Sequence, residues 1–329
     1  MAVDSERRRA ALDWYEDHRE DLLAALEHAR RRENDAEVIE LALSAAPFLA
    51  QRPYWDESEE VARWGLDAAE RAEEDPVAAE MLNVLGTIHR LRARFEESVF
   101  EFEESARRFR DCGDGKGAAA ALNNLGVVLP EVGKDDPGRD ALSESVRIWR
   151  ALEQDGEVRA GLARSLNNFG TATVAEDPGG ARGCFYEALA LREEIGDEAG
   201  AADALDNLGQ LAGREGDWKG AVDFHGRALG LRREADDEYG VPRTCMLLAM
   251  ALAELGQTAE ARSLIGDALA IDIRLRGGRL SAPGEPDRAS LVSSFLNPLE
   301  EYKGFSELIE EIEEIDPAAA RELRLDLGP

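Results

Sequence analysis

Ala121-Leu122-Asn123-Asn124-Leu125-Gly126 is the stretch that decides the fold, because the chain repeats it. The phrase returns as Ser165-Leu166-Asn167-Asn168-Phe169-Gly170 and as Ala204-Leu205-Asp206-Asn207-Leu208-Gly209. Looser copies stand before and after these three, at 81–86 and 245–249. The last small residue of each copy serves as an anchor, and the steps between anchors are 40, 44, 39 and 40 residues, counted through Gly86, Gly126, Gly170, Gly209 and Ala249. A constant period of this length is the signature of a repeat architecture.

A second block of small residues follows each anchor. The first small residue comes eleven or twelve positions later and the next one seven positions after that, as in Ala221 and Ala228. Small side chains let two helix backbones approach closely, while Leu, Phe and Ile at i, i+3 and i+4 fill the seam. Breakers such as Gly216-Asp217 separate the two blocks. The pattern predicts an all-α fold, a right-handed α-solenoid of about seven antiparallel helix pairs.

Specific residues resemble a known repeat. Leu125-Gly126, the Gly-Asp-Trp of 216–218, and the spaced Ala221 and Ala228 are similar to the tetratricopeptide repeat, in a version with a period near 40. The resemblance covers 76–277 and implies five repeats of a tetratricopeptide-like superhelix that binds protein or peptide. With the extended second helix around 191–197, the repeats resemble those of kinesin light chains and of the sensor region of bacterial STAND-type regulators.

The two ends differ from the repeats. Residues 1–75 are expected to form N-terminal capping helices and a degenerate repeat, with helices over 13–26, 35–50 and 56–71. The first of these resembles the helix that opens the repeat region of STAND-type regulators. Residues 278–329 are expected to form a loop, then a degenerate repeat and a capping helix.

Composition argues against several functions. The net charge of −30, from 69 acidic and 39 basic residues, repels phosphate backbones, so no direct nucleic-acid partner is expected. The three cysteines and four histidines show no metal-ligand or nucleophile–base spacing, and no phosphate-binding loop occurs. No signal peptide or membrane span is evident. We therefore expect a cytoplasmic protein that needs no cofactor and is not an enzyme; an unrecognised helical enzyme is the least favoured alternative.

A partner is expected on the first helices of the pairs, which line the concave face of such a superhelix. Asparagine can donate to and accept from a peptide backbone, and arginine can hold a carboxylate or phosphate. The resemblance implies the same role, because the Leu-Asn-Asn-Leu phrase contacts bound peptide in relatives. The alternative is that the asparagines bond the adjacent repeat, above all Asn124, Asn168 and Asn207. The candidate binding residues are Asn83, Arg90, Asn123, Asn124, Arg164, Asn167, Asn168, Asp206, Asn207, Gln210 and Arg243.

Two functions follow from this surface. The first is the sensor or interaction part of a signalling, regulatory or defence system, whose ATPase or effector is encoded separately. The second is a stand-alone scaffold that bridges partner proteins in a constitutive complex. The first predicts a phosphate-binding loop in a longer parent chain or a neighbouring gene, and the second predicts stable co-purifying partners.

Overall fold

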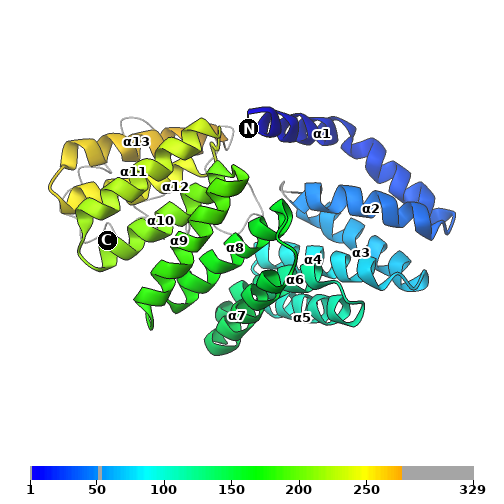
Figure 1. The fold of residues 1–329 in the computed structure, drawn as a ribbon. Helices are drawn as coiled ribbons and strands as arrows, with labels where there is room; N and C mark the ends of the chain where they lie inside the picture. Colours follow the sequence, from blue (N-terminus) through cyan, green and yellow to red (C-terminus); the bar gives the residue numbers. More distant parts are fainter. Residues whose placement is uncertain (1, 51–53, 276–329) are drawn as a thin grey trace, which may run out of the picture. The chain divides into compact units, whose positions relative to one another are not determined.

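The computed structural model describes residues 2–50 and 54–275, and this part of the chain consists of helices and turns without a β-strand (Figure 1). Consecutive helices pack as pairs, from α2 with α3 to α12 with α13. The predicted all-α fold of antiparallel helix pairs is confirmed. The helices are α1 (Ala2–Arg31), α2 (Asp35–Ala50), α3 (Trp55–Arg71), α4 (Asp75–Leu91), α5 (Phe95–Asp111), α6 (Gly115–Val128), α7 (Asp135–Ala151), α8 (Gly156–Thr173), α9 (Pro178–Ile195), α10 (Glu198–Arg214), α11 (Trp218–Glu234), α12 (Val241–Glu254) and α13 (Thr258–Leu275), with a short 3-10 turn η1 (Leu129–Val132) after α6.

The chain divides into two compact units, residues 1–196 (unit 1) and 197–329 (unit 2). Within unit 1 the first helices of successive pairs touch one another: α2 contacts α4, α4 contacts α6, and α6 contacts α8. No second helix in the described part of unit 1 contacts the next second helix to a similar extent. The first helices therefore form the more closely spaced layer of unit 1. In unit 2, α10 contacts α12 in the same way.

The anchors work as the repeat pattern predicts. A Cβ on Gly86 would lie 2.8 Å from the ring of Phe102, and one on Gly170 would lie 2.6 Å from Phe185. Serine at the small positions adds a bond across the pair, since Ser98 Oγ donates to the carbonyl of Gly86 over 2.7 Å. Ser105 Oγ similarly donates to the carbonyl of Ala79 over 2.8 Å. Close helix approach thus comes from small residues on both partners.

The turns between helices use a left-handed residue followed by a capping aspartate. Gly216 has φ of 80°, and Asp217 accepts a hydrogen bond from the backbone N–H of Gly220 over 3.0 Å. This arrangement satisfies an orphan donor at the start of α11. Some equivalent turns place a non-glycine residue in the left-handed conformation, among them Ala93 with φ of 55°.

Exchange of these two turn residues is expected to shift stability in opposite directions. Ala93→Gly should raise the free energy of unfolding by about 0.5–1 kcal/mol, because glycine adopts positive φ without the Cβ clash. Gly216→Ala should lower it by about 1 kcal/mol, since nothing but the backbone conformation opposes the methyl group there. Urea unfolding of both variants measures the difference, and a loss of stability in Ala93→Gly would contradict the explanation.

The helix expected at 13–26 lies within the longer α1 (Ala2–Arg31). The segments expected at 35–50 and 56–71 are α2 (Asp35–Ala50) and α3 (Trp55–Arg71). The loop and terminal repeat expected over 278–329 lie outside the described residues. None of the helices that the structure describes is long and apolar enough to cross a membrane.

Candidate functional site

Three first helices of unit 1 carry the candidate binding residues of that unit on one face each. On α4 the candidates Asn83 and Arg90 stand in a row with Glu80 and Thr87, at spacings of three, four and three positions, so the four side chains share one side of the helix. Equivalent positions on α6 and α8 continue the pattern. We call this surface the asparagine face; it comprises Glu80, Asn83, Thr87 and Arg90 on α4, Ala120, Asn123, Asn124 and Val127 on α6, and Arg164, Asn167, Asn168 and Thr171 on α8.

A ladder of side-chain amides joins these helices. Asn124 Nδ2 donates to Asn83 Oδ1 over 2.9 Å, and Asn168 Nδ2 donates to Asn123 Oδ1 over the same distance. Within α6, Asn123 Nδ2 donates to Asn124 Oδ1 over 3.3 Å. The second asparagine of one repeat therefore bonds the first asparagine of the repeat before it. For Asn124 and Asn168 the structure supports the alternative role, a bond to the adjacent repeat.

Burial along the ladder differs from expectation. Asn123 is 3% exposed, Asn167 is 9% exposed and Asp206 of unit 2 is fully buried, although all three were expected to face a partner. Asn124 and Asn168, expected nearer the seam, keep partial exposure. The reason is the close spacing of the first helices. It encloses Asn123, Asn167 and Asp206, each of which is the first of two adjacent polar residues. The partly exposed asparagines of the face are therefore Asn83, Asn124 and Asn168.

Three charged residues of the face lack a counter-charge in contact. In the described part of the chain, no hydrogen bond or ion pair is formed by the side chains of Glu80, Arg90 or Arg164. Burial lowers the pKa of the Arg90 and Arg164 guanidinium groups and raises the pKa of the Glu80 carboxyl. All three retain partial or full solvent exposure. Partly desolvated charges that remain accessible are suited to meeting an opposite charge on a partner.

Most arginines in the described part of unit 1 pair with a carboxylate, and Arg90 and Arg164 do not. Arg71, Arg92 and Arg108, for example, each contact a carboxylate within 2.8 Å. The chain also has a large excess of acidic residues, at a net charge of −30. Arg90 and Arg164 therefore belong to a minority of arginines, which also includes the exposed Arg32 and Arg110, that form no ion pair in the described residues.

In unit 2 the equivalent aspartate belongs to a buried network. Asp206 accepts from His225 Nδ1 over 2.9 Å and from Thr244 Oγ1 over 2.7 Å, and Arg232 lies 3.4 Å away. Arg232 also pairs with Asp203 over 2.5 Å. Burial works to lower the pKa of Arg232, but Asp203, Asp206 and Asp237 together raise it. Asp206 is thus enclosed by its network, and its carboxylate offers no accessible surface to a partner, contrary to the position expected for it.

The remaining candidates of unit 2 keep accessible surface. Arg243 is exposed, and Asn207 and Gln210 are partly exposed. The side chains of Asn207 and Arg243 form no hydrogen bond or ion pair in the described residues, and Gln210 Nε2 donates to the carbonyl of Asp206 over 3.4 Å. These three do not form an amide ladder of the kind seen in unit 1.

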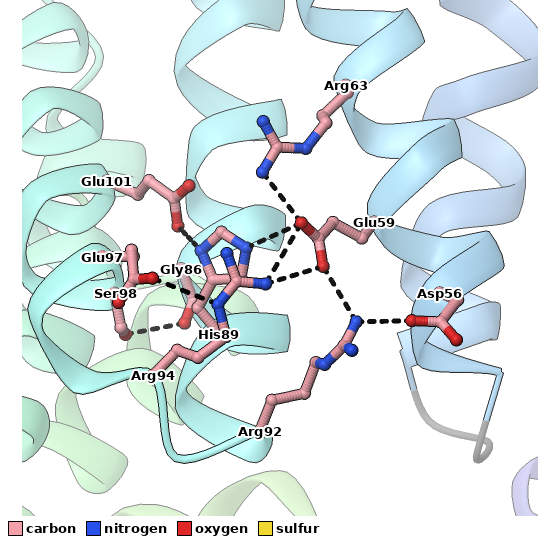
Figure 2. A network of polar contacts seen from close by, with 10 residues as sticks. All are labelled: Asp56, Glu59, Arg63, Gly86, His89, Arg92, Arg94, Glu97, Ser98 and Glu101. Atoms are coloured by element: carbon pink, nitrogen blue, oxygen red, sulfur yellow. Dashed lines mark hydrogen bonds and ion pairs between the residues drawn. The ribbon is translucent and has the colours of Figure 1, made fainter.

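A second polar network lies on the side of α4 opposite the asparagine face. Figure 2 shows the ring of His89 between two carboxylates: Nδ1 donates to Glu101 over 2.6 Å, and Nε2 lies 3.3 Å from Glu59. Arg92 and Arg94 also reach Glu59, over 2.9 and 3.0 Å. His89 is 1% exposed and follows Thr87 by two residues, so it lies on the opposite side of α4 from the asparagine face. The network holds α3, α4 and α5 together.

Glu59 should make stability depend on pH. Burial works to raise its pKa, yet bonds from Arg63, His89 and Arg94 outweigh burial and lower the pKa to about 2, from an ordinary 4.5. A lowered folded-state pKa means that the stabilisation is present above the unfolded pKa and is lost as the pH falls toward 2. We expect the stability difference between the wild type and Glu59→Gln to shrink by about 1 kcal/mol from pH 6 to pH 3.5.

Urea unfolding at the two pH values measures this change. The glutamine side chain of the variant does not titrate, so the variant lacks the pH-dependent contribution of this site while the other carboxylates remain. A difference that stays constant between pH 6 and pH 3.5 would contradict the role assigned to Glu59.

Chemistry that requires reactive groups finds little support. No group of three or more metal-ligating side chains is present in the described residues. Burial raises the pKa of Cys184, and raises that of Cys245 to about 11, which disfavours the nucleophilic thiolate. What the asparagine face offers is hydrogen bonding and charge, the chemistry of binding.

Comparison with known proteins agrees with the fold. The Tetratricopeptide repeat profile matches residues 201–235. BtubC (BKLC) from P. vanneervenii is 18% identical with a TM-score of 0.58, covering 72% of this chain and 98% of that one. A Rap protein complexed with competence and sporulation factor is 16% identical with a TM-score of 0.59, covering 98% of this chain and 95% of that one. No curated protein matches the chain.

A third similar structure carries the name of an enzyme. Aspartyl phosphate phosphatase F from Bacillus subtilis is 12% identical with a TM-score of 0.55, covering 90% of this chain and 87% of that one. Identities this low show a shared fold alone. The helix pairs, the repeat period and the profile matched over 201–235 together give the chain a tetratricopeptide-like repeat fold. Such a fold is that of a protein-interaction module.

Proposed function

We propose that this chain is a non-catalytic module that binds a protein or peptide along the asparagine face of unit 1. The observation that carries the proposal is the pair Arg90 and Arg164, which bear accessible charges without a counter-charge in contact. They flank an amide ladder in which Asn83 uses only its oxygen, so its Nδ2 remains able to donate to a peptide carbonyl. A mixed surface of this kind suits an extended backbone with charged side chains.

The wider role we propose is the sensor or interaction part of a signalling, regulatory or defence system in the cytoplasm. Its ATPase or effector would be encoded separately. The likeness to a Rap protein complexed with competence and sporulation factor supports binding of a separate factor as a role open to this fold. The second candidate is a scaffold in a constitutive complex. A phosphate-binding loop in a longer parent chain or a neighbouring gene favours the sensor, and partners that co-purify stoichiometrically favour the scaffold.

The double variant Arg90→Ala/Arg164→Ala tests the proposed surface. We expect it to lose at least about tenfold in partner recovery when protein is used to capture partners from native lysate, since charge-assisted bonds contribute about 1.5–3 kcal/mol each. The matched control is Arg110→Ala/Arg147→Ala, which removes two exposed arginines from the second helices α5 and α7. Equal recovery by both double variants and the wild type would show that partners bind elsewhere.

A further inference from the structure

Two places on the asparagine face concentrate charge of one sign. Glu80 on α4 lies near Asp114, the residue that caps α6, and the second carboxylate adds to burial in raising the pKa of Glu80. Arg164 on α8 lies near Arg192 on α9, and this second guanidinium adds to burial in lowering the pKa of Arg164. Glu80 and Arg164 therefore each carry a charge that a like neighbour makes less favourable, and neither side chain has an opposite charge in contact within the described residues.

Arg90 differs from Arg164 in this respect. The carboxylate of Glu131 lies close enough to Arg90 to favour its charged form, although no ion pair is formed. Arg90 also stands ten positions after Glu80, about 15 Å along the axis of α4. Glu80 and Arg164 are thus the residues of the face that an opposite charge on a partner would stabilise most, a cation at Glu80 and an anion at Arg164.

The amide ladder gives the positions of Glu80 and Arg164 relative to each other. Glu80 and Arg164 stand three residues before Asn83 and Asn167, one helical turn away on the same face. Ala120 holds the equivalent position on α6 and is partly exposed. No large side chain therefore stands at this position between Glu80 and Arg164. Because neighbouring helices pack 8–10 Å apart, the span from α4 to α8 is roughly 16–20 Å, the length of about five or six extended residues.

We infer that the asparagine face binds an extended peptide segment in one direction, with a basic group at Glu80 and a carboxylate at Arg164. This inference rests on the proposed function and specifies the chemistry of the partner. The ladder amides, one helical turn from the two charges, can hydrogen-bond the backbone of any sequence, so the charge pair supplies the orientation. An opposite orientation would bring like charges together at both ends of the segment.

The probe is a synthetic library of nine-residue peptides with acetylated N-termini and amidated C-termini, randomised at every position. We expect the wild type to enrich peptides with a basic and an acidic residue four to six positions apart, in one fixed order. The charge-swapped variant Glu80→Arg/Arg164→Glu should enrich the reverse order. A second library with free C-termini distinguishes a terminal carboxylate from an acidic side chain as the group at Arg164.

Single substitutions keep the test decisive if the charge-swapped variant does not fold. Arg164→Gln should bind the peptides selected by the wild type about tenfold more weakly and lose the preference for an acidic residue, while the basic preference remains. Arg164→Lys should retain both preferences. Peptides selected with the same charge order by every variant would overturn the inference but leave peptide binding intact, whereas failure of the wild type to enrich any peptide would contradict the proposed function itself.

Discussion

Asp206→Ala is expected to lower the free energy of unfolding by about 3–5 kcal/mol, the largest effect of any single substitution considered for this protein. Removing the carboxylate leaves the Arg232 guanidinium, 4% exposed, with a reduced set of partners, and leaves His225 and Thr244 without their acceptor. Desolvated polar groups without partners are costly because neither water nor protein satisfies them. Urea unfolding followed by circular dichroism measures the loss.

Asp203→Ala is the matched control, since it removes a carboxylate that contacts the same guanidinium. The Asp203 contact is the shorter of the two, 2.5 Å against 3.4 Å, but the Asp203 side chain is 50% exposed. Burial decides the outcome, because water replaces an exposed partner and cannot replace an enclosed one. We expect a loss of no more than about 1 kcal/mol, and equal losses in the two variants would contradict the structural role of Asp206.

Gly126→Val is expected to destabilise unit 1 by about 3 kcal/mol or more. A Cβ at this anchor would lie 2.5 Å from Leu142 Cγ and 2.8 Å from the carbonyl oxygen of Gly138. The leucine could change rotamer, but the backbone oxygen moves only if α6 and α7 separate. Thermal and urea unfolding of the variant report the cost of that separation.

Gly183→Ala tests whether close approach, rather than the loss of glycine as such, causes the effect. Gly183 lies within α9, and a Cβ there would meet nothing within 4 Å. Alanine favours the helix over glycine by up to about 1 kcal/mol, so this variant should gain stability. A loss in Gly183→Ala similar to that in Gly126→Val would remove the basis for treating the anchors as contact points.

The fold could be predicted because its determinants repeat. The anchor glycines meet a side chain fifteen or sixteen residues later in each pair: Phe102, Leu142, Phe185 and His225. Four independent copies of one spacing outweigh the ambiguity of any single helix pattern. The sequence also predicts where one helix ends and the next begins wherever Gly-Asp stands between them, as at Gly216. The 3-10 turn Leu129–Val132 carries Pro130 but falls outside the shared pattern, so the repeat does not predict it.

The site was predicted less well because it depends on contacts between repeats. Position along a helix indicates which face a residue shares, but the depth to which that face is enclosed depends on the distance to the next helix. Asn123 and Asn124 are adjacent in sequence, yet the first is buried and the second is partly exposed. His89 joins three helices through its contacts with Glu59 and Glu101. This set of residues is not repeated in the other helix pairs, so the repeat pattern does not predict the contact.

The buried position of Asp206 had a partial signal. His225 stands where the pairs anchored at Gly86, Gly126 and Gly170 have a large apolar residue, and Asp206 stands where those pairs have asparagine. The two exceptions occur in the same pair and bond each other over 2.9 Å. Two departures from a repeat within one unit can therefore indicate a compensating contact.

The central claim is that a partner lies on the first helices of unit 1, and photo-crosslinking tests it most directly. A peptide selected by the wild type is resynthesised with a photoreactive phenylalanine analogue at successive positions, irradiated with the full-length protein, and mapped by mass spectrometry. The structure predicts crosslinks within 80–90, 120–127 and 164–171, moving from α4 to α8 as the photoreactive group moves along the peptide. Crosslinks confined to the second helices α5, α7 and α9, or to unit 2, would contradict the claim.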